Sequence, residues 1–279
     1  MRPGKKFKRV EIIERLKKRI GDGVPVIGAG SSCGLVAKCA EIGGADLIIV
    51  YSTGISRLKG LPTSHNLGHS NSMTLDMADE ILNVVKGTPV ICGIEACDAS
   101  SWDLEYLVDK FMDAGFSGII NFPTIGLFEN NTLWRNMKES VGLGFSREIE
   151  LVKIARSKDI FTMAYVFTPQ EAEDMANAGL DCLVPHAGGT AGGLQGFATV
   201  DYNEGARVIQ DMISAAQKIN PQIICLAHGG PFAQPEDTEH LYRHTDAAGF
   251  VGASSIERIP IENAVIEAVK NFKSYKTGK

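Results

Sequence analysis

Short apolar runs recur along this chain, and each follows a glycine that ends a helix-like segment. Residues 42–49, 113–120, 177–184 and 247–251 show this arrangement most clearly. Glycine just beyond a helix adopts the left-handed conformation that ends the helix. The run that follows is apolar on both faces, as a parallel strand covered by helices must be. The pattern predicts eight strands, at residues 24–29, 46–51, 89–94, 118–122, 160–167, 182–185, 223–227 and 249–253.

Helix-like segments separate these strands. Residues 74–86 and 101–114 carry apolar side chains at helical spacing. The run Thr168-Pro169-Gln170-Glu171 is a capping box with proline at the first helical position. The alternation of strands and helices predicts a single (β/α)8 TIM barrel, one domain over residues 1–279. An extra amphipathic N-terminal helix at residues 8–20 leads us to expect that residues 1–22 close the barrel floor.

Composition narrows the function classes. The 279 residues, 44% of them hydrophobic, suit one barrel of roughly 250 residues. A net charge of −5 gives no support for nucleic-acid or membrane-surface binding. No apolar run reaches the roughly 18 residues of a membrane span. The six cysteines form no C-x-x-C pair, and no apolar signal region follows the first residues, which together predict a cytoplasmic protein with reduced thiols. The long connections 52–73 and 123–145 predict functional lids or subunit contacts. We expect such subunit contacts to belong to a homo-oligomer.

Runs of small residues lie at the ends of the last two predicted strands. His228-Gly229-Gly230-Pro231 follows the seventh strand, and residues 252–258 follow the eighth. In a TIM barrel the loops after these strands hold phosphate, because glycine exposes backbone N–H groups that bind an anion. We therefore expect a small anionic metabolite here, with Arg57 adding positive charge. The predicted binding residues are Gly28, Arg57, Gly229, Gly230, Gly252, Ala253, Ser254 and Ser255.

Histidines end two of the apolar strands. His186 and His228 share one context, an apolar strand before the histidine and small residues after it. Because imidazole titrates near neutral pH, a histidine at the barrel mouth can act as a general acid or base. The alternative is a structural histidine bonded to nearby backbone. Two histidines in equivalent positions favour the catalytic interpretation.

Carboxylates supply the remaining candidates. Asp98 and Glu257 are predicted catalytic carboxylates, although Glu257 could instead pair with Arg258 and hold its loop. Asp98 and Glu95, after the third strand, are candidate Mg²⁺ ligands. The alternative for Asp98 is to cap a helix that starts near Ser100. No cofactor beyond a possible Mg²⁺ is expected.

Several other patterns indicate no site. The Gly28-x-Gly30 start lacks the acidic residue that a dinucleotide site requires about 20 residues on. No base is placed beside Cys97, which argues against a nucleophile. The histidine pairs 65/69 and 240/244 lack the glutamate of a zinc H-E-x-x-H motif.

Three motifs resemble one known family. Residues 121–127 (Asn-Phe-Pro-Thr-Ile-Gly-Leu), 228–231 and 252–260 are similar to those of the phosphoenolpyruvate hydrolase-like TIM-barrel family, over residues 24–265. That family includes the C-terminal domain of a tomato tobamovirus-resistance protein. It is similar in fold to phosphoenolpyruvate mutase and phosphonopyruvate hydrolase. The several acidic Mg²⁺ ligands of true mutases are not visible, because the second strand ends in Tyr51-Ser52 and the fourth in Asn121.

The resemblance implies a hydrolase or lyase that cleaves a C–C, C–P or phosphoester bond. Its substrate would be a phosphoenolpyruvate- or phosphonopyruvate-like acid, bound at the C-terminal face of the barrel. The alternative is a non-catalytic small-molecule-binding or signalling barrel that acts through protein partners. Fold alone does not decide between them.

Overall fold

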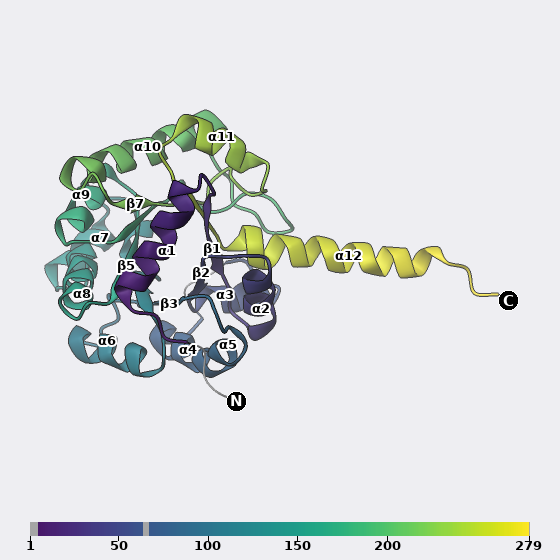
Figure 1. Ribbon diagram of the computed structural model, residues 1–279, viewed down its shortest axis with the longest axis horizontal. Coiled ribbons are helices and arrows are strands. Elements are labelled where there is room, and N and C mark those ends of the chain that lie inside the picture. Colours follow the sequence, from purple (N-terminus) through teal and green to yellow (C-terminus); the bar gives the residue numbers. More distant parts are fainter. Residues whose placement is uncertain (1–4, 64–66, 279) are drawn as a thin grey trace.

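Parallel strands surround a central core in the computed structural model, which describes residues 5–63 and 67–278. Their order is β7-β6-β5-β4-β3-β2-β1-β9-β8, and every pairing between them is parallel. Helices alternate with the strands and form the outer layer (Figure 1), which confirms the TIM-barrel prediction. The strands are β1 (Val26–Gly30), β2 (Leu47–Val50), β3 (Val90–Gly93), β4 (Gly118–Ile120), β5 (Phe161–Val166), β6 (Cys182–Pro185), β7 (Ile224–Cys225), β8 (Ala227–His228) and β9 (Gly249–Gly252).

The barrel closes through a strand that is split in two. β7 pairs with β6 and β8 pairs with β9, with only Leu226 between them. The N–H of Leu226 donates to the carbonyl of Leu183 at 2.9 Å, and an isolated bridge joins His186 to His228. The prediction of one continuous strand at residues 223–227 is therefore wrong in detail. β7 and β8 share the seventh position, which leaves eight positions around the barrel.

Alternate strand residues point into the barrel, which explains why the runs are apolar throughout. In β2 and just beyond it, Leu47, Ile49 and Tyr51 belong to the interior cluster, whereas Ile48 and Val50 pack under the outer helices. Burial of both faces is what a helix-covered parallel strand requires. Glycine supplies room where strands approach closely: a Cβ at Gly28 would lie 3.0 Å from Ile49 Cδ1.

The outer helices differ from the prediction in two places. Segment 74–86 is not one helix, because α4 ends at Asp76 and α5 begins at Ala78. The long connections contain α3, the first residues of α4, and α7 rather than loops alone. The helices are α2 (Gly34–Ile42), α3 (Thr53–Leu58), α4 (Ser70–Asp76), α5 (Ala78–Val84), α6 (Leu104–Asp113), α7 (Leu133–Ser140), α8 (Phe145–Ser157), α9 (Pro169–Asn177), α10 (Tyr202–Ile219), α11 (Asp237–His244) and α12 (Ile259–Ser274). Short helical turns lie at η1 (Ile125–Leu127) and η2 (Ser254–Arg258).

The N-terminal helix α1 (Arg9–Gly21) crosses the end of the barrel where the strands begin (Figure 1). Its Ile12 and Leu16 are fully buried in the interior cluster. Arg9 forms an ion pair of 2.7 Å with Asp181, just before β6. These contacts leave the opposite end, where the strands finish, as the open end of the barrel.

The C-terminal helix α12 extends away from the barrel (Figure 1). Its apolar side chains are largely exposed, with Phe272 at 83% and Val265 at 57% of their possible accessible area. Among the described residues, no helix combines the length and the apolar character that crossing a bilayer requires.

Candidate functional site

Cavities lie at the open end of the barrel, and the more central one holds the predicted histidines. This histidine cavity has a volume of about 230 Å³ and is lined by residues that follow β2, β4, β6, β8 and β9. Strand ends that converge on one cavity are the usual place for a TIM-barrel active site. Its lining residues are Tyr51, Thr53, Arg57, Thr63, Phe122, Leu127, His186, Gly189, Thr190, Phe197, His228, Ala253 and Ser254.

The two histidines carry their protons on different nitrogens. His186 Nδ1 accepts a hydrogen bond of 3.0 Å from the N–H of Gly188, so its proton is on Nε2. His228 Nδ1 lies 2.6 Å from the carbonyl oxygen of Val251, so this nitrogen donates and Nε2 keeps a lone pair. The ring centroids are 4.5 Å apart. The pair therefore presents one donor and one acceptor.

Burial keeps both imidazoles neutral. It lowers the pKa of His228 to about 4, although the hydrogen bond to Val251 acts in the opposite direction. Burial also lowers the pKa of His186 well below its usual value, and the neighbouring His228 adds to that effect. Tyr165 packs against both rings, with centroids 5.0 and 5.4 Å away. At neutral pH His228 is therefore an uncharged base and His186 an uncharged hydrogen-bond donor.

A buried ion pair stands beside the histidines. Arg57 donates to Glu257 Oε2 from Nε at 3.0 Å and from Nη2 at 2.7 Å, and the N–H of Ser32 donates to the other carboxylate oxygen. The predicted alternative partner of Glu257, Arg258, instead pairs with Glu262 at 3.1 Å, so that alternative is wrong. Arg57 lines the cavity and can bind an anion, while Glu257 is occupied in holding it.

The predicted anion cup is only partly present in the cavity wall. Ala253 and Ser254 line the cavity, but the N–H of Gly230 donates to the carbonyl of Gly188 at 2.8 Å and is not available to a ligand. Gly229 has a positive φ of 76°, and a Cβ there would lie 2.3 Å from the same carbonyl oxygen. The remaining predicted binding residues lie outside the described lining; they are Gly28, Gly252 and Ser255.

Asp98 lies apart from the histidines and holds a turn. Its carboxylate accepts from the N–H of Ser100 at 2.8 Å, from the Ser100 and Ser101 hydroxyls, and from Asn71. These hydrogen bonds outweigh burial and lower the pKa of Asp98. Asp98 does not cap a helix near Ser100, because α6 begins at Leu104 with Asp103 as its cap.

The chemistry of the donors does not fit a Mg²⁺ site at Asp98 and Glu95. Four donors already engage the carboxylate of Asp98, and Glu95 lines a different cavity. Across residues 5–63 and 67–278 there is no group of three or more His, Cys, Asp or Glu that could hold a metal. Mg²⁺ is usually bound through one or two carboxylates, and the oxygens of Asp98 are already engaged by hydrogen-bond donors. Of the histidine pair 65/69, residue 65 lies outside the described residues.

Hydroxyl groups in the cavity wall were not predicted. Thr53 Oγ1 and Thr63 Oγ1 are buried without a hydrogen-bond partner in the described part of the chain, and both residues line the histidine cavity. A buried hydroxyl without a partner is costly, and a polar ligand removes that cost. Thr53 belongs to α3, in a segment that the sequence predicts as a loop, so the pattern provided no basis for placing its hydroxyl in the cavity.

The family model described as phosphoenolpyruvate hydrolase-like matches residues 11–275. The chain belongs to the phosphoenolpyruvate hydrolase-like family. Its membership confirms the resemblance seen in the three sequence motifs.

Relatives of this family member include two proteins of Solanum lycopersicum. The ToMV susceptible protein tm-1(GCR26) and the ToMV resistance protein Tm-1(GCR237) are each 39% identical to it over 272 residues. The match covers 96% of this chain but only 36% of each tomato protein. The chain therefore spans about a third of the length of these relatives.

A solved enzyme structure shares the fold. Phosphonopyruvate hydrolase in complex with oxalate and Mg²⁺ matches with a TM-score of 0.61 at 17% sequence identity, over 94% of this chain and 87% of that one. Identity this low supports the barrel architecture and leaves the chemistry of this phosphoenolpyruvate hydrolase-like chain to its own residues.

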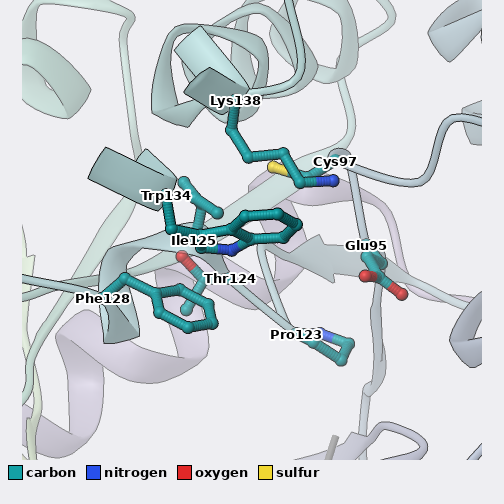
Figure 2. A pocket seen from close by; sticks show the side chains of 8 residues that line it. All are labelled: Glu95, Cys97, Pro123, Thr124, Ile125, Phe128, Trp134 and Lys138. Carbon is teal, nitrogen blue, oxygen red and sulfur yellow. The ribbon is translucent and has the colours of Figure 1, made fainter. Parts of the chain in front are cut away.

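A second cavity lies beside the histidine cavity, between the segments that follow β3 and β4 and helix α7. We call it the tryptophan cavity; its volume is about 450 Å³ (Figure 2). Cys97 at its wall is not a reactive nucleophile, because burial and the adjacent Glu148 raise the pKa of the thiol. Its lining residues are Glu95, Cys97, Pro123, Thr124, Ile125, Phe128, Trp134 and Lys138.

Proposed function

We propose that this chain is a hydrolase or lyase for a small phosphoenolpyruvate- or phosphonopyruvate-like acid, bound in the histidine cavity. The main support is that two neutral histidines of opposite tautomer lie in one cavity with the cation of Arg57. The fold relationship to phosphonopyruvate hydrolase, crystallised with the small dicarboxylate oxalate, supports this substrate class. A cavity of about 230 Å³ suits a ligand of a few heavy atoms.

Each residue has a distinct part in the proposed reaction. Arg57 binds the carboxylate of the acid, and Ser254 provides a further hydrogen bond. His228 Nε2 takes a proton from the attacking water, and His186 Nε2–H donates a proton to the leaving group. A bound anion raises the pKa of His228 toward neutrality and strengthens it as a base. With phosphoenolpyruvate or phosphonopyruvate and one water, the products are pyruvate and inorganic phosphate.

Turnover of both compounds tests the proposal. The purified chain is incubated with phosphoenolpyruvate or phosphonopyruvate, with added Mg²⁺ or with EDTA, while pyruvate and phosphate release are measured. We expect release that EDTA does not abolish, since hydrogen-bond donors already engage the carboxylate of Asp98, the predicted Mg²⁺ ligand. No binding and no turnover under either condition would overturn the proposal.

A second candidate is a non-catalytic binding or signalling barrel. The low pKa of His228, which burial brings to about 4, favours it, because so weak a base abstracts protons slowly. Saturable binding of either acid without product would support this candidate over the enzyme.

The organisation around the site is also proposed rather than shown. We infer one domain over residues 1–279, a cytoplasmic location and a homo-oligomer. The exposed apolar side chains of α12, including Phe272, are where we expect a second copy to pack. Light scattering with size-exclusion chromatography measures the oligomeric state, and a monomer at micromolar concentration would contradict it.

A further inference from the structure

The tryptophan cavity is a separate compartment with its own chemistry. The described lining residues of the two cavities do not overlap, although both draw on the segment after β4. Phe122 and Leu127 face the histidine cavity, whereas Pro123, Ile125 and Phe128 line the tryptophan cavity. A volume of about 450 Å³ lies in the range of natural small-molecule sites.

Two opposite charges enter this cavity without forming an ion pair. Lys138 and Glu95 reach toward the same space from different sides (Figure 2), yet among the described residues neither has an ion-pair partner within 4.0 Å. Lys138 Nζ lies 5.0 Å from the centroid of the Trp134 ring. Burial raises the pKa of the Glu95 carboxyl, while Ser70 and the positive charge of Lys138 act in the opposite direction. The two charges therefore interact through space without forming an ion pair.

An apolar wall lies next to the charges. Trp134 is 49% exposed, and its flat indole faces the cavity beside Phe128 (Figure 2). Ile125 and Pro123 continue the wall. An aromatic ring that covers this indole would gain ring–ring attraction in addition to the burial of its area.

The back of the cavity is rigid. Buried Glu148 of α8 accepts hydrogen bonds from Thr124 Oγ1 at 2.7 Å, from the N–H of Ile125 at 2.7 Å and from Asn121 at 2.5 Å. Cys97 contributes its thiol at 3.5 Å. These bonds fix the segment after β4, so the wall is formed before any ligand arrives.

We propose that the tryptophan cavity binds a small zwitterion with an apolar body, of the aromatic α-amino-acid type. The ligand's ammonium lies at Glu95, its carboxylate at Lys138 and its side chain against Trp134 and Phe128. The ligand's two charges supply a counter-ion to each of these side chains. This site stands independently of the reaction in the histidine cavity.

Tryptophan fluorescence tests the site directly. The chain has two tryptophans, so Trp102→Phe leaves Trp134 as the sole reporter. Titration of this variant with L-phenylalanine, which does not absorb where tryptophan is excited, is expected to give a saturable emission change. Phenethylamine lacks the carboxylate and 3-phenylpropionate lacks the amine, and each is expected to bind at least about tenfold more weakly, the loss of one charged contact.

Matched variants separate recognition from folding. Glu95→Gln should weaken the binding of L-phenylalanine about tenfold while leaving that of 3-phenylpropionate unchanged. Lys138→Met should weaken the binding of L-phenylalanine about tenfold while leaving that of phenethylamine unchanged. Circular dichroism and thermal unfolding confirm that each variant is folded. The proposal is overturned if L-phenylalanine gives no saturable change at millimolar concentration, or if all three compounds bind equally to the folded variants.

Discussion

The two cavities lie side by side at the same end of the barrel but handle charge in opposite ways. In the histidine cavity Arg57 is paired with Glu257 and both imidazoles are neutral. In the tryptophan cavity Lys138 lies over the Trp134 ring, and the described part of the chain gives neither Lys138 nor Glu95 an ion-pair partner. The first cavity is central and small, so burial forces its charges to be satisfied internally. The second is peripheral, so solvent or a ligand can satisfy them. Under our two proposals, the same fold provides one site for reaction and one for recognition.

The largest contrast should appear in stability when the central ion pair is broken. Glu257→Gln leaves the guanidinium of Arg57 buried without a counter-ion, and we expect a loss of about 3–5 kcal/mol in the free energy of unfolding. Urea unfolding measures this loss. The double variant Arg57→Met/Glu257→Gln removes both charges and should recover much of the stability. Equal stability of Glu257→Gln and the unmodified chain would contradict the description of the pair as a buried charge.

The next effect concerns activity in the histidine cavity. His228→Gln should lower kcat/KM for the turned-over acid by about 100-fold or more, because a general base contributes roughly 10²–10⁴-fold. His244→Gln is the matched control, since His244 is exposed on α11. A loss as large in the control, or no loss in His228→Gln, would exclude a catalytic His228.

A smaller effect links stability to pH through Glu148, behind the tryptophan cavity. Burial raises its pKa to about 7 from the usual 4.5, although hydrogen bonds from Thr124, Ile125 and Asn121 act in the opposite direction. The folded chain then holds a proton that the unfolded chain has released. Stability should therefore fall by about 1–3 kcal/mol as pH rises from about 4.5 to 7. Urea midpoints measured across this range should lose that decline in Glu148→Gln; an unchanged decline would assign it to other groups.

The smallest effect is expected where the charges have no ion-pair partner among the described residues. Glu95→Gln and Lys138→Met should each change the free energy of unfolding by less than about 1 kcal/mol, because neither breaks an ion pair and Lys138→Met removes only the contact with the Trp134 ring. Thermal unfolding without ligand measures this. A loss comparable with that of Glu257→Gln would show that the two charges are structural, and would remove the distinction between the cavities.

Sequence patterns predicted the barrel because each strand carries local signals. The glycine before four of the apolar runs and the capping box at Thr168 are short-range features, and Thr168 does accept from the N–H of Glu171. The positions of His186 and His228 at the barrel mouth followed from the same strand count. These inferences needed no knowledge of distant contacts.

The hydrogen-bond and ion-pair partners within the site could not be predicted from the sequence, because they are distant along the chain. Arg57 and Glu257 are 200 residues apart, and the neighbouring Arg258 was the closer alternative. The tryptophan cavity was missed for a different reason: its Trp134 and Lys138 lie on α7, in a segment that the sequence predicts as a loop. Four hydrogen-bond donors around Asp98, Asn71 among them, likewise turned a predicted metal ligand into part of a turn.

The strand pairing that closes the barrel between β6 and β8 includes the two histidines. His186 and His228 form the last bridge between β6 and β8, and the N–H of Ala187 donates to the carbonyl of His228 at 2.9 Å. Any local opening of the barrel at this strand pairing changes the distance between the two imidazoles. The hydrogen-exchange rate of the Ala187 amide therefore reports on this junction, and it should slow when a ligand contacts both rings. Binding in the histidine cavity would then stabilise the closed barrel against local opening.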